Sequence, residues 1–339
     1  MSSIGFTAAR LADLTLKPSD ATLLALSGPQ VRPLLNPHEV LDAVREAFVL
    51  HSRGKGRVFS VVRERLDTGG IFGIKSGDVQ GEALLGLKAA GFWHANRSAG
   101  GEPHQATVML FDPATGRPLC IVDGNAITTA RTGAAGRLGL QMLARPDSKR
   151  ICVFGTGVQA RIQLDLALDL LRETEIVRYV TSRGEPNTDF EVAFAGRCAL
   201  KHSVDPNEAV SESDIVITAT PGSGPLFSTD AVRPGTHINA VGTDTKGKRE
   251  LPEGILQKAR LFVDDKRQSR QIGEGQWGDT KDEIEIGRIL AGEIAISRQP
   301  NDITLFDMTG LALQDLTVAR MLYQRAIADG HGTHIPWPW

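Results

Sequence analysis

The stretch RICVFGTGVQARIQLDLAL, residues 150–168, constrains the fold of this chain more than any other. An apolar, strand-like run ends at Gly155 and gives way to a pattern of helical spacing. The segment fits G-x-G-x-x-A, in which the glycines permit a tight turn and a close phosphate, and a small third residue lets the helix pack on the strand. The first N–H groups of the helix and its dipole then favour a phosphate. We predict a dinucleotide-binding turn made by Gly155, Thr156, Gly157, Val158, Gln159 and Ala160.

The sequence after residue 150 alternates strand-like and helix-like segments. Strands that alternate with helices form a parallel sheet with crossover helices. The pattern therefore predicts an α/β fold with a doubly wound parallel sheet in this part of the chain. Strands are expected at residues 150–154, 175–181, 213–220, 236–242 and 260–264. Later helices are expected at residues 283–294 and 310–328.

The first 150 residues are organised differently. Apolar positions at helical spacing predict a helix over residues 38–53, and a segment rich in small residues predicts another over 126–144. Between them, turn signals such as DTGG and DPATGRP separate β-rich runs, which predicts a mostly antiparallel sheet. These runs are residues 57–66, 70–77, 84–93, 105–112 and 118–124. The last helix of the chain could pack on this sheet, and the tail HIPWPW is expected to dock on a surface.

Composition excludes several classes of partner. The 339 residues favour two domains, and a formal net charge of −2 gives no attraction to nucleic acid or to an anionic membrane. No apolar run reaches the ~20 residues that span a bilayer, and the start MSSIGFTAARLADLTL lacks the pattern of a signal peptide. The cysteines Cys120, Cys152 and Cys198 form no CxxC pair, and the scattered histidines have no zinc spacing, so no metal is expected. We expect a cytoplasmic protein with a small-molecule partner.

The end of the strand at residues 175–181 is where a dinucleotide fold selects its nucleotide. NAD sites usually place an acidic residue there, which binds the ribose 2′-hydroxyl. Here the strand runs into Ser182 and Arg183, and an arginine beside a hydroxyl can bind a 2′-phosphate. We therefore expect NADP(H) in preference to NAD(H). Glu185, which could bind the ribose hydroxyl instead, favours the opposite choice. Thr220, at the end of a later strand, is a further candidate for cofactor binding.

Three longer motifs carry a resemblance to a known family. They are HQATVMLFDPATGRPLCIVDGNAITTARTGAAG at residues 104–136, FGTGVQA at 154–160 and HINAVGTDTKGKREL at 237–251. Together they resemble the ornithine cyclodeaminase/mu-crystallin family. The segment LGLKAAGFWHAN, residues 85–96, followed by HQATVMLFDP, is most similar to the imine-reducing members.

The resemblance implies a particular domain organisation. A Rossmann-type sheet, residues 133–307, is inserted after an α+β substrate-binding and dimerisation domain made of residues 1–132 with 308–339. The family implies a homodimer. It also explains why 150 residues precede the glycine turn.

The resemblance also implies cationic residues that bind a substrate carboxylate. Lys88 and Arg131 match the family pattern, and Arg63 matches it with Arg65 as a near neighbour. Arg131 is expected where a helix begins, so that its guanidinium and the N-terminus of the helix would converge on one anion. Lys88 could in addition transfer a proton if neighbouring cations lower its pKa.

Other site residues come from the second half of the chain or lie near the predicted sheet. Asp244 follows a parallel strand at the position of the family's catalytic aspartate, where it could stabilise a positive substrate nitrogen. Thr309 and Gly310 resemble the segment that closes over the nicotinamide, and Asp315 is read as structural. His104 is a hypothesis for a cation that meets a second substrate carboxylate.

These residues predict the reduction of an α-imino acid to an L-amino acid with NAD(P)H, reversible as an amino-acid dehydrogenase. Iminosuccinate and cyclic ketimines such as Δ1-pyrroline-2-carboxylate are the candidate substrates. An ornithine cyclodeaminase, a lyase that recycles its bound NAD, is the alternative, and the Ser182-Arg183 ending argues against it. A non-catalytic binder of nucleotide and ligand is the third reading, and the presence of Lys88, Arg131 and Asp244 argues against that one.

Overall fold

The computed structural model describes residues 17–222, 224–280 and 282–338. The chain divides into two compact units: one combines the residues up to Arg131 with those from Leu311 onwards, and the other comprises Thr132–Gly310. We call them unit 1 and unit 2. Residues 1–16, in which the sequence shows no signal-peptide pattern, lie outside the described residues.

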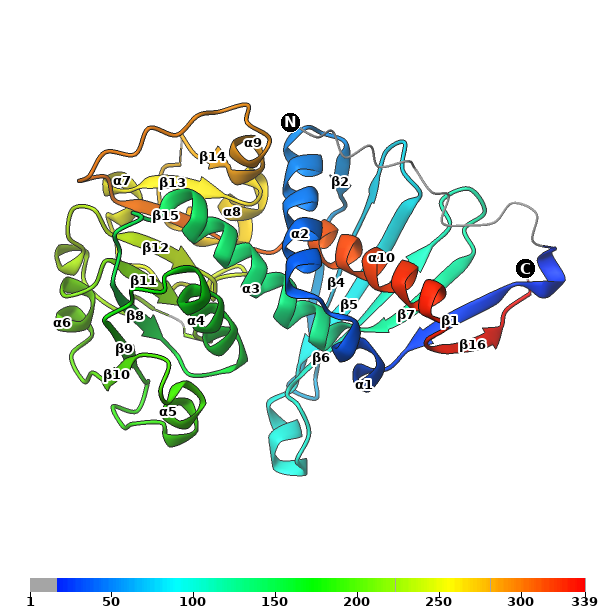
Figure 1. Ribbon diagram of the computed structural model, residues 1–339, viewed down its shortest axis with the longest axis horizontal. Coiled ribbons are helices and arrows are strands. Elements are labelled where there is room, and N and C mark those ends of the chain that lie inside the picture. The colour runs from blue at the N-terminus through cyan, green and yellow to red at the C-terminus, as the bar shows by residue number, and fades with distance from the viewer. Residues whose placement is uncertain (1–16, 223, 281, 339) are drawn as a thin grey trace. The chain divides into compact units, whose positions relative to one another are not determined.

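Unit 1 is built on a mostly antiparallel sheet, as the sequence predicts (Figure 1). The strands lie in the order β16-β1-β7-β6-β5-β4-β2, and β3 also pairs with β4. Within this order β1 and β7 run parallel. The strands are β1 (Thr22–Leu26), β2 (Gly56–Val58), β3 (Val62–Arg65), β4 (Ile71–Val79), β5 (Leu84–Phe92), β6 (His104–Phe111), β7 (Pro118–Asp123) and β16 (Thr333–Pro336).

Helices of unit 1 pack on this sheet. Helix α2 (Pro37–Ser52) begins after Asn36, whose side chain accepts hydrogen bonds from the backbone N–H groups of His38 and Glu39. Helix α10 (Ala312–Asp329) contacts α2 and also strands β4, β5 and β6, which confirms the prediction that the last helix packs on the N-terminal sheet (Figure 1). The short α1 (Gly28–Val31) and the start of α3 (Gly124–Leu143) complete the helices described in this unit.

Unit 2 is a parallel, doubly wound sheet, and the predicted Rossmann-type fold is confirmed (Figure 1). Its strands lie in the order β10-β9-β8-β11-β12-β15-β13-β14, and each pair of neighbouring strands is parallel. The strands are β8 (Arg150–Phe154), β9 (Ile176–Val180), β10 (Ala199–His202), β11 (Ile215–Thr218), β12 (His237–Ala240), β13 (Arg260–Val263), β14 (Ile284–Glu285) and β15 (Thr304–Asp307). Besides the rest of α3, its α-helices are α4 (Val158–Leu170), α5 (Thr188–Phe194), α6 (Pro206–Ser211), α7 (Ile255–Lys258), α8 (Lys266–Ile272) and α9 (Ile286–Leu290).

The core of unit 2 explains why its strands read as continuous apolar runs. Alternate residues of β8 enter two different apolar clusters, Ile151 and Val153 in one and Cys152 and Phe154 in the other. Both faces of the sheet are therefore covered, and every position of the strand favours an apolar side chain.

Several short elements differ from the sequence prediction. The run at 57–66 is divided between β2 and β3, and the helix expected at 283–294 is reduced to β14 and the short α9. Strands β1, β10 and β15 were not predicted from the sequence, although other strands of four or five residues were. The tail docks within its own chain: β16 pairs antiparallel with β1.

Candidate active site

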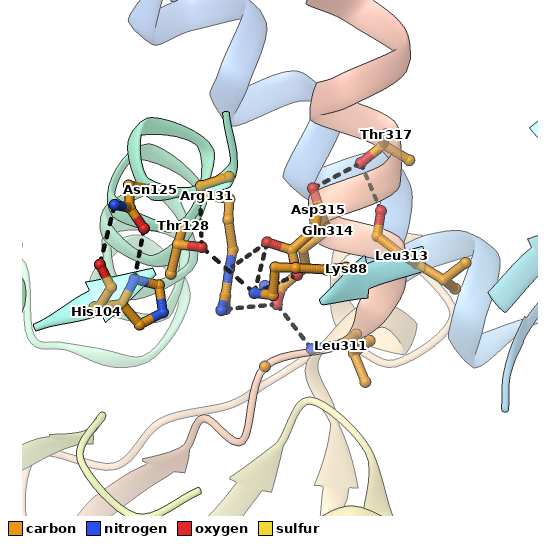
Figure 2. Close-up of polar contacts among 12 residues, drawn as sticks. Lys88, His104, Asn125, Thr128, Arg131, Leu311, Leu313, Gln314, Asp315 and Thr317 are labelled. Carbon is orange, nitrogen blue, oxygen red and sulfur yellow. Dashed lines mark hydrogen bonds and ion pairs between the residues drawn. The ribbon is translucent and has the colours of Figure 1, made fainter. Parts of the chain in front are cut away.

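Two basic side chains of unit 1 converge on one buried carboxylate (Figure 2). Lys88 Nζ, from β5, lies 2.9 Å from Asp315 Oδ1 and 2.8 Å from Asp315 Oδ2. Arg131 Nε, from α3, lies 3.3 Å from Asp315 Oδ1. Asp315 has no exposed surface, and Lys88 and Arg131 are both buried. The structure therefore brings together two of the three cations that the sequence singled out, and it adds an acid between them.

The first turn of α10 supports this cluster. Gln314 Oε1 accepts a hydrogen bond from the Leu311 N–H at 2.9 Å and another from Arg131 Nη1 at 3.2 Å. Asp315 lies in the same turn, where the helix dipole favours a negative charge. The sequence expectation for Arg131 was wrong in one respect, because α3 begins at Gly124 and Arg131 lies well inside it. The helix N-terminus near its guanidinium is that of α10.

The donors of the cluster are only partly used. Arg131 Nη2 has no hydrogen-bond partner among the residues that the structure describes. Lys88 Nζ makes one long contact besides Asp315, 3.5 Å to Thr128 Oγ1, which itself donates to the Gly124 carbonyl. A carboxylate ligand could take the remaining N–H groups, since guanidinium and ammonium donors both bind carboxylates strongly.

Burial and charge shift the pKa values of this cluster. Burial lowers the pKa of Lys88 to about 7; the Asp315 carboxylate opposes this shift, and the Arg131 and Lys75 charges add to it. Burial alone would raise the pKa of Asp315, but the Lys88 and Arg131 charges override it and hold that pKa below its usual range. Near neutral pH, the charged and neutral forms of Lys88 are therefore both populated, while Asp315 stays ionised.

One face of the unit 1 sheet collects further basic residues. Lys75 in β4 lies directly opposite Lys88 in β5 and is also buried. Arg63 in β3 lies opposite Gly73, and its Nε is 3.7 Å from the position that a Cβ of Gly73 would occupy. Because facing residues and every second residue share a face, Arg63, Lys75 and Lys88 lie on the same side of the sheet. Arg63 is on this face, but it is not among the hydrogen-bond partners of Lys88, Arg131 or Asp315.

His104 begins β6 on this same face and is held by Asn125 (Figure 2). Asn125 Nδ2 donates to the His104 carbonyl at 3.1 Å, and Asn125 Oδ1 lies 2.9 Å from His104 Nδ1. This arrangement favours a proton on Nδ1 and leaves Nε2 as an acceptor. Burial and the Lys88 charge lower the pKa of His104, so the structure favours a neutral imidazole over the cation that the sequence suggested.

The glycine turn of unit 2 has the geometry of a phosphate site. Gly155 has φ +96°, and a Cβ there would lie 2.7 Å from the Ala219 carbonyl, so only glycine fits. A Cβ on Gly157 would meet no atom within 4 Å, and no side chain caps the start of α4. The N–H groups of the helix therefore face open space, which fits a bound pyrophosphate. Ala160 is fully buried against the sheet, as the motif requires.

The other residues predicted for the cofactor have distinct surroundings in unit 2. Ser182 and Arg183 follow β9 and are exposed, and Glu185 is exposed beside them. Thr156 accepts a hydrogen bond from Asn187 Nδ2 at 3.1 Å. A further group is anchored by buried carboxylates: Thr309 Oγ1 and the Gly310 N–H donate to Asp264, and Thr220 donates to Glu250.

Asp244 lies in the turn that follows β12. It is half-buried, and its Oδ1 lies 3.6 Å from Lys248 Nζ and accepts from Thr245 Oγ1 at 3.1 Å. Gly242 lies two residues before Asp244 in this turn, and the need for a glycine there is internal to the protein. A Cβ on Gly242 would lie 2.3 Å from the Glu250 carboxylate, so this glycine makes room for a buried acid.

The sequence analysis missed part of the cluster in unit 1. Asp315 was read as structural, and Lys75, Thr128 and Gln314 were not singled out. The sequence did contain a signal for Asp315. It is the one charged residue in the segment Ala312–Ala319, all of which is buried in the structure. A buried carboxylate in such a segment needs a cationic partner, but the sequence does not say which one.

The sequence of this chain matches one known protein family along most of its length. The model of the ornithine cyclodeaminase/mu-crystallin family matches residues 22–330. The chain belongs to the ornithine cyclodeaminase/mu-crystallin family. The resemblance stated from its motifs is thereby confirmed. No helix among the described residues is long and apolar enough to cross a membrane, and no cluster of potential metal ligands occurs among them.

Relatives of this family member are oxidoreductases. Iminosuccinate reductase of Paracoccus denitrificans is 32% identical, with 91% of this chain and 98% of that protein covered. Its structure in complex with NAD+ has a TM-score of 0.85, with 93% of this chain and 99% of that chain covered. Alanine dehydrogenase of Archaeoglobus fulgidus is 34% identical, with 92% of this chain and 98% of that protein covered.

Two further solved structures match along nearly their whole length. An archaeal alanine dehydrogenase dimer with bound NAD has a TM-score of 0.84 and 31% identity, with 93% of this chain and 99% of that chain covered. Δ1-pyrroline-2-carboxylate reductase of Thermococcus litoralis, in complex with NADH and L-proline, has a TM-score of 0.84 and 30% identity, with 92% and 100% covered. These relatives are imine-reducing enzymes or amino-acid dehydrogenases, and the solved examples bind NAD(H).

The pKa of Lys88 gives a pH prediction for this family member. Lys88 loses its charge as the pH rises through about 7, so the affinity for a non-reacting carboxylate such as succinate should fall above that pH. We expect up to about a tenfold loss per pH unit, measured by titration calorimetry from about pH 6 to 9. Lys88→Gln should bind succinate weakly with no such dependence. If the affinity of the wild type for succinate were constant across this pH range, Lys88 would not be the cation that binds the carboxylate.

Proposed function

We propose that this chain reduces an α-imino acid to an L-amino acid with NADPH or NADH. The observation that carries the proposal is the buried pair of Lys88 and Arg131, which outnumber the Asp315 carboxylate and keep donors for a second anion. A substrate carboxylate is the anion that suits these donors. The glycine turn of unit 2, whose residues fit a dinucleotide, supplies the second requirement.

Each residue has a defined part in the proposed reaction. The nicotinamide cofactor supplies a hydride when it is bound by the turn at Gly155–Ala160. Arg131 and Lys88 bind the α-carboxylate of the substrate, and Asp315 holds both cations in place. Asp244 stabilises the positive charge on the substrate nitrogen, which makes the adjacent carbon a better hydride acceptor. Because its pKa is about 7, Lys88 can also donate a proton near neutral pH.

Lys75 favours a dicarboxylic substrate over a cyclic ketimine. It is buried opposite Lys88, and like charges that face each other across two strands repel. A substrate with two carboxylates brings two negative charges to this pair of lysines, whereas a ring imine with one carboxylate brings one. Iminosuccinate is therefore the preferred candidate, and Δ1-pyrroline-2-carboxylate the second.

The test of the proposed function is a panel of imines with both reduced cofactors. We expect cofactor oxidation with oxaloacetate plus ammonia to exceed that with pyruvate plus ammonia and that with Δ1-pyrroline-2-carboxylate. Lys75→Met should remove this preference and leave the activity with pyruvate plus ammonia. Preference for the ring imine would favour a proline-forming enzyme, and ammonia release from ornithine without added reductant would favour the cyclodeaminase. Bound cofactor without turnover on any imine would overturn the proposal.

Asp244→Ala tests the acid in this mechanism. We expect the variant to lose turnover on every imine of the panel and to keep its affinity for NADPH within about threefold, because the carboxylate acts on the substrate nitrogen. Steady-state rates and fluorescence titration with NADPH give the two measurements. A variant that keeps full activity would remove Asp244 from the mechanism.

NADP(H) is the proposed cofactor, although the solved relatives above bind NAD(H). The support is Arg183 together with Ser182. Both are exposed and follow β9, where a dinucleotide fold would bind a 2′-phosphate. Arg183→Ala should raise the Kd for NADPH about tenfold and leave the Kd for NADH unchanged, since only the former carries the extra phosphate. Arg172→Ala, an exposed arginine before β9, is the control and should change neither. An equal loss for both nucleotides would contradict the proposal.

We further propose a homodimer. Alternate residues of the unit 1 sheet, on the face opposite to α10, are apolar and only half-buried; they include Phe72, Ile74, Leu85, Leu87 and Met109. A second copy would cover this face. Light scattering after gel filtration should give twice the mass of one chain, and the mass of a single chain would refute the proposal.

A further inference from the structure

A buried glutamate in unit 2 connects the ends of two neighbouring strands. Glu250 Oε1 accepts hydrogen bonds from the Thr220 N–H and from Thr220 Oγ1, both at 2.6 Å. Its other oxygen, Oε2, accepts from the Gly242 N–H at 2.9 Å. Thr220 follows β11 and Gly242 follows β12, which are adjacent in the sheet. The Glu250 side chain has no exposed surface, so these donors replace its water.

The pattern of donors requires a carboxylate. The two backbone N–H groups lie on different oxygens of Glu250, and neither can rotate away as a hydroxyl can. A glutamine has one carbonyl oxygen, so its NH2 group would face one of the two N–H donors. A glutamine at position 250 therefore has nearly the same shape and breaks one of the two contacts.

The two anchored strand ends carry groups of the proposed reaction. Thr220 is a candidate for binding the nucleotide, and Gly242 lies two residues before Asp244 in the same turn. The carboxyl ends of parallel strands are where such sheets bind their ligands. A carboxylate that bridges these ends sets the spacing between the nucleotide side and the Asp244 turn.

We infer that Glu250 is a positioning residue, which holds Thr220 and the Asp244 turn in the arrangement that hydride transfer requires. The inference rests on the proposed function. Glu250 touches neither substrate nor cofactor in this role, and it acts through the backbone of Thr220 and Gly242. Burial raises the pKa of Glu250, against the lowering effect of its Thr220 donors, so its ionised form is retained at a cost to stability.

The cost of burying the Glu250 charge makes it possible to distinguish a positioning role of Glu250 from a structural one. Glu250→Gln removes a buried charge and loses one hydrogen bond, so the melting temperature should stay near that of the wild type. In contrast, kcat should fall about 10–100-fold, because small misplacements of reacting groups are costly, and the Kd for NADPH should rise several-fold. A purely structural glutamate would lower the melting temperature and leave kcat per folded molecule unchanged.

Glu274 in η5 (Glu274–Trp277) provides the matched control. It is also a buried acid with a raised pKa, and burial is the main cause. All of its side-chain contacts fall on Oε1, from Thr243 Oγ1 at 2.5 Å, the Glu250 N–H at 2.8 Å and the Leu251 N–H at 3.4 Å. One amide oxygen has two lone pairs and can keep the two short contacts, and the third contact is already long. Glu274→Gln should therefore keep kcat within about twofold of the wild type, although it also replaces a buried acid.

The experiment measures kcat, KM, NADPH affinity and melting temperature for the wild type, Glu250→Gln, Glu250→Asp and Glu274→Gln. Aspartate keeps two acceptor oxygens but is shorter, so kcat should fall less in Glu250→Asp than in Glu250→Gln. If Glu250→Gln does not fold, the kcat of Glu250→Asp tests the inference. Equal kcat in the wild type and Glu250→Gln, or equal losses in Glu250→Gln and Glu274→Gln, would overturn the inference. A wild type that reduces no imine would refute the proposed function instead, and the NADPH affinities would still test Glu250.

Discussion

Asp315→Asn is expected to lower the free energy of unfolding by about 3–5 kcal/mol, the usual cost of removing one partner from a buried ion pair. Asp315 is fully buried, and Lys88 and Arg131 both contact it. The asparagine has nearly the same shape, so the loss comes from two cations that keep their burial and lose their counter-charge. Lys88 can relieve part of this cost by releasing its proton. Without the Asp315 charge the pKa of Lys88 falls further below about 7, so the deficit should shrink as the pH rises toward 7 and stay constant above it. Urea unfolding at about pH 5 and about pH 8 measures it.

A second aspartate in the same helix is the control for this prediction. Asp329 is the last residue of α10; its side chain is about half exposed and lies 3.8 Å from Arg325 Nε. Exposed pairs of this kind contribute little, so Asp329→Asn should change the free energy of unfolding by less than about 0.5 kcal/mol. If Asp315→Asn and Asp329→Asn lost similar amounts of the free energy of unfolding, the buried ion pairs of Asp315 would stabilise the chain no more than an exposed pair does.

Arg131→Met is expected to lower kcat/KM for the preferred imine by about 10²–10³-fold, because a charge-assisted contact to a carboxylate is lost in a buried site. Most of the loss should appear in KM if Arg131 holds the carboxylate equally in the ground state and the transition state. The fold should tolerate the change better than Asp315→Asn, since Lys88 and Asp315 still neutralise each other. Initial rates across a range of substrate concentrations measure both parameters.

Arg320→Met distinguishes loss of substrate binding from loss of a partly buried arginine. Arg320 in α10 bridges Glu46 and Glu82, at 2.6 and 2.8 Å, and does not contact the Lys88 cluster. Its replacement should destabilise the chain through two glutamates left without their partner, but kcat/KM per folded molecule should stay near that of the wild type. The assignment of Arg131 to the substrate would fail if Arg131→Met behaved in the same way.

Much of the fold was predictable from the sequence because its signals are local. The glycine turn needs a positive φ at Gly155 and open space at Gly157, and both requirements appear as glycines in the sequence. The strands of unit 2 are buried on both faces and so appear as short apolar runs. The edge strand β10 is partly exposed and contains Lys201 and His202, so its pattern did not differ from that of a loop.

The candidate site was only partly predictable, because its contacts join residues far apart in the chain. Lys88 and Arg131 were found through family motifs, whereas Asp315 was read as structural. That Asp315 pairs with Lys88, 227 positions earlier, depends on how α10 lies on β5. The same packing decides which residues share a face, and it thereby places Lys75 beside Lys88.

The sequence by itself determined most of the elements, the glycine turn and the family, since each depends on short-range periodicity or on a contiguous motif. Only the tertiary structure decided the protonation of the site. The pKa of Lys88 is near 7 and that of His104 is lowered because of burial and of charges contributed by separate elements. These effects depend on distance in space and on exclusion of water, and neither quantity is encoded in the order of neighbouring residues.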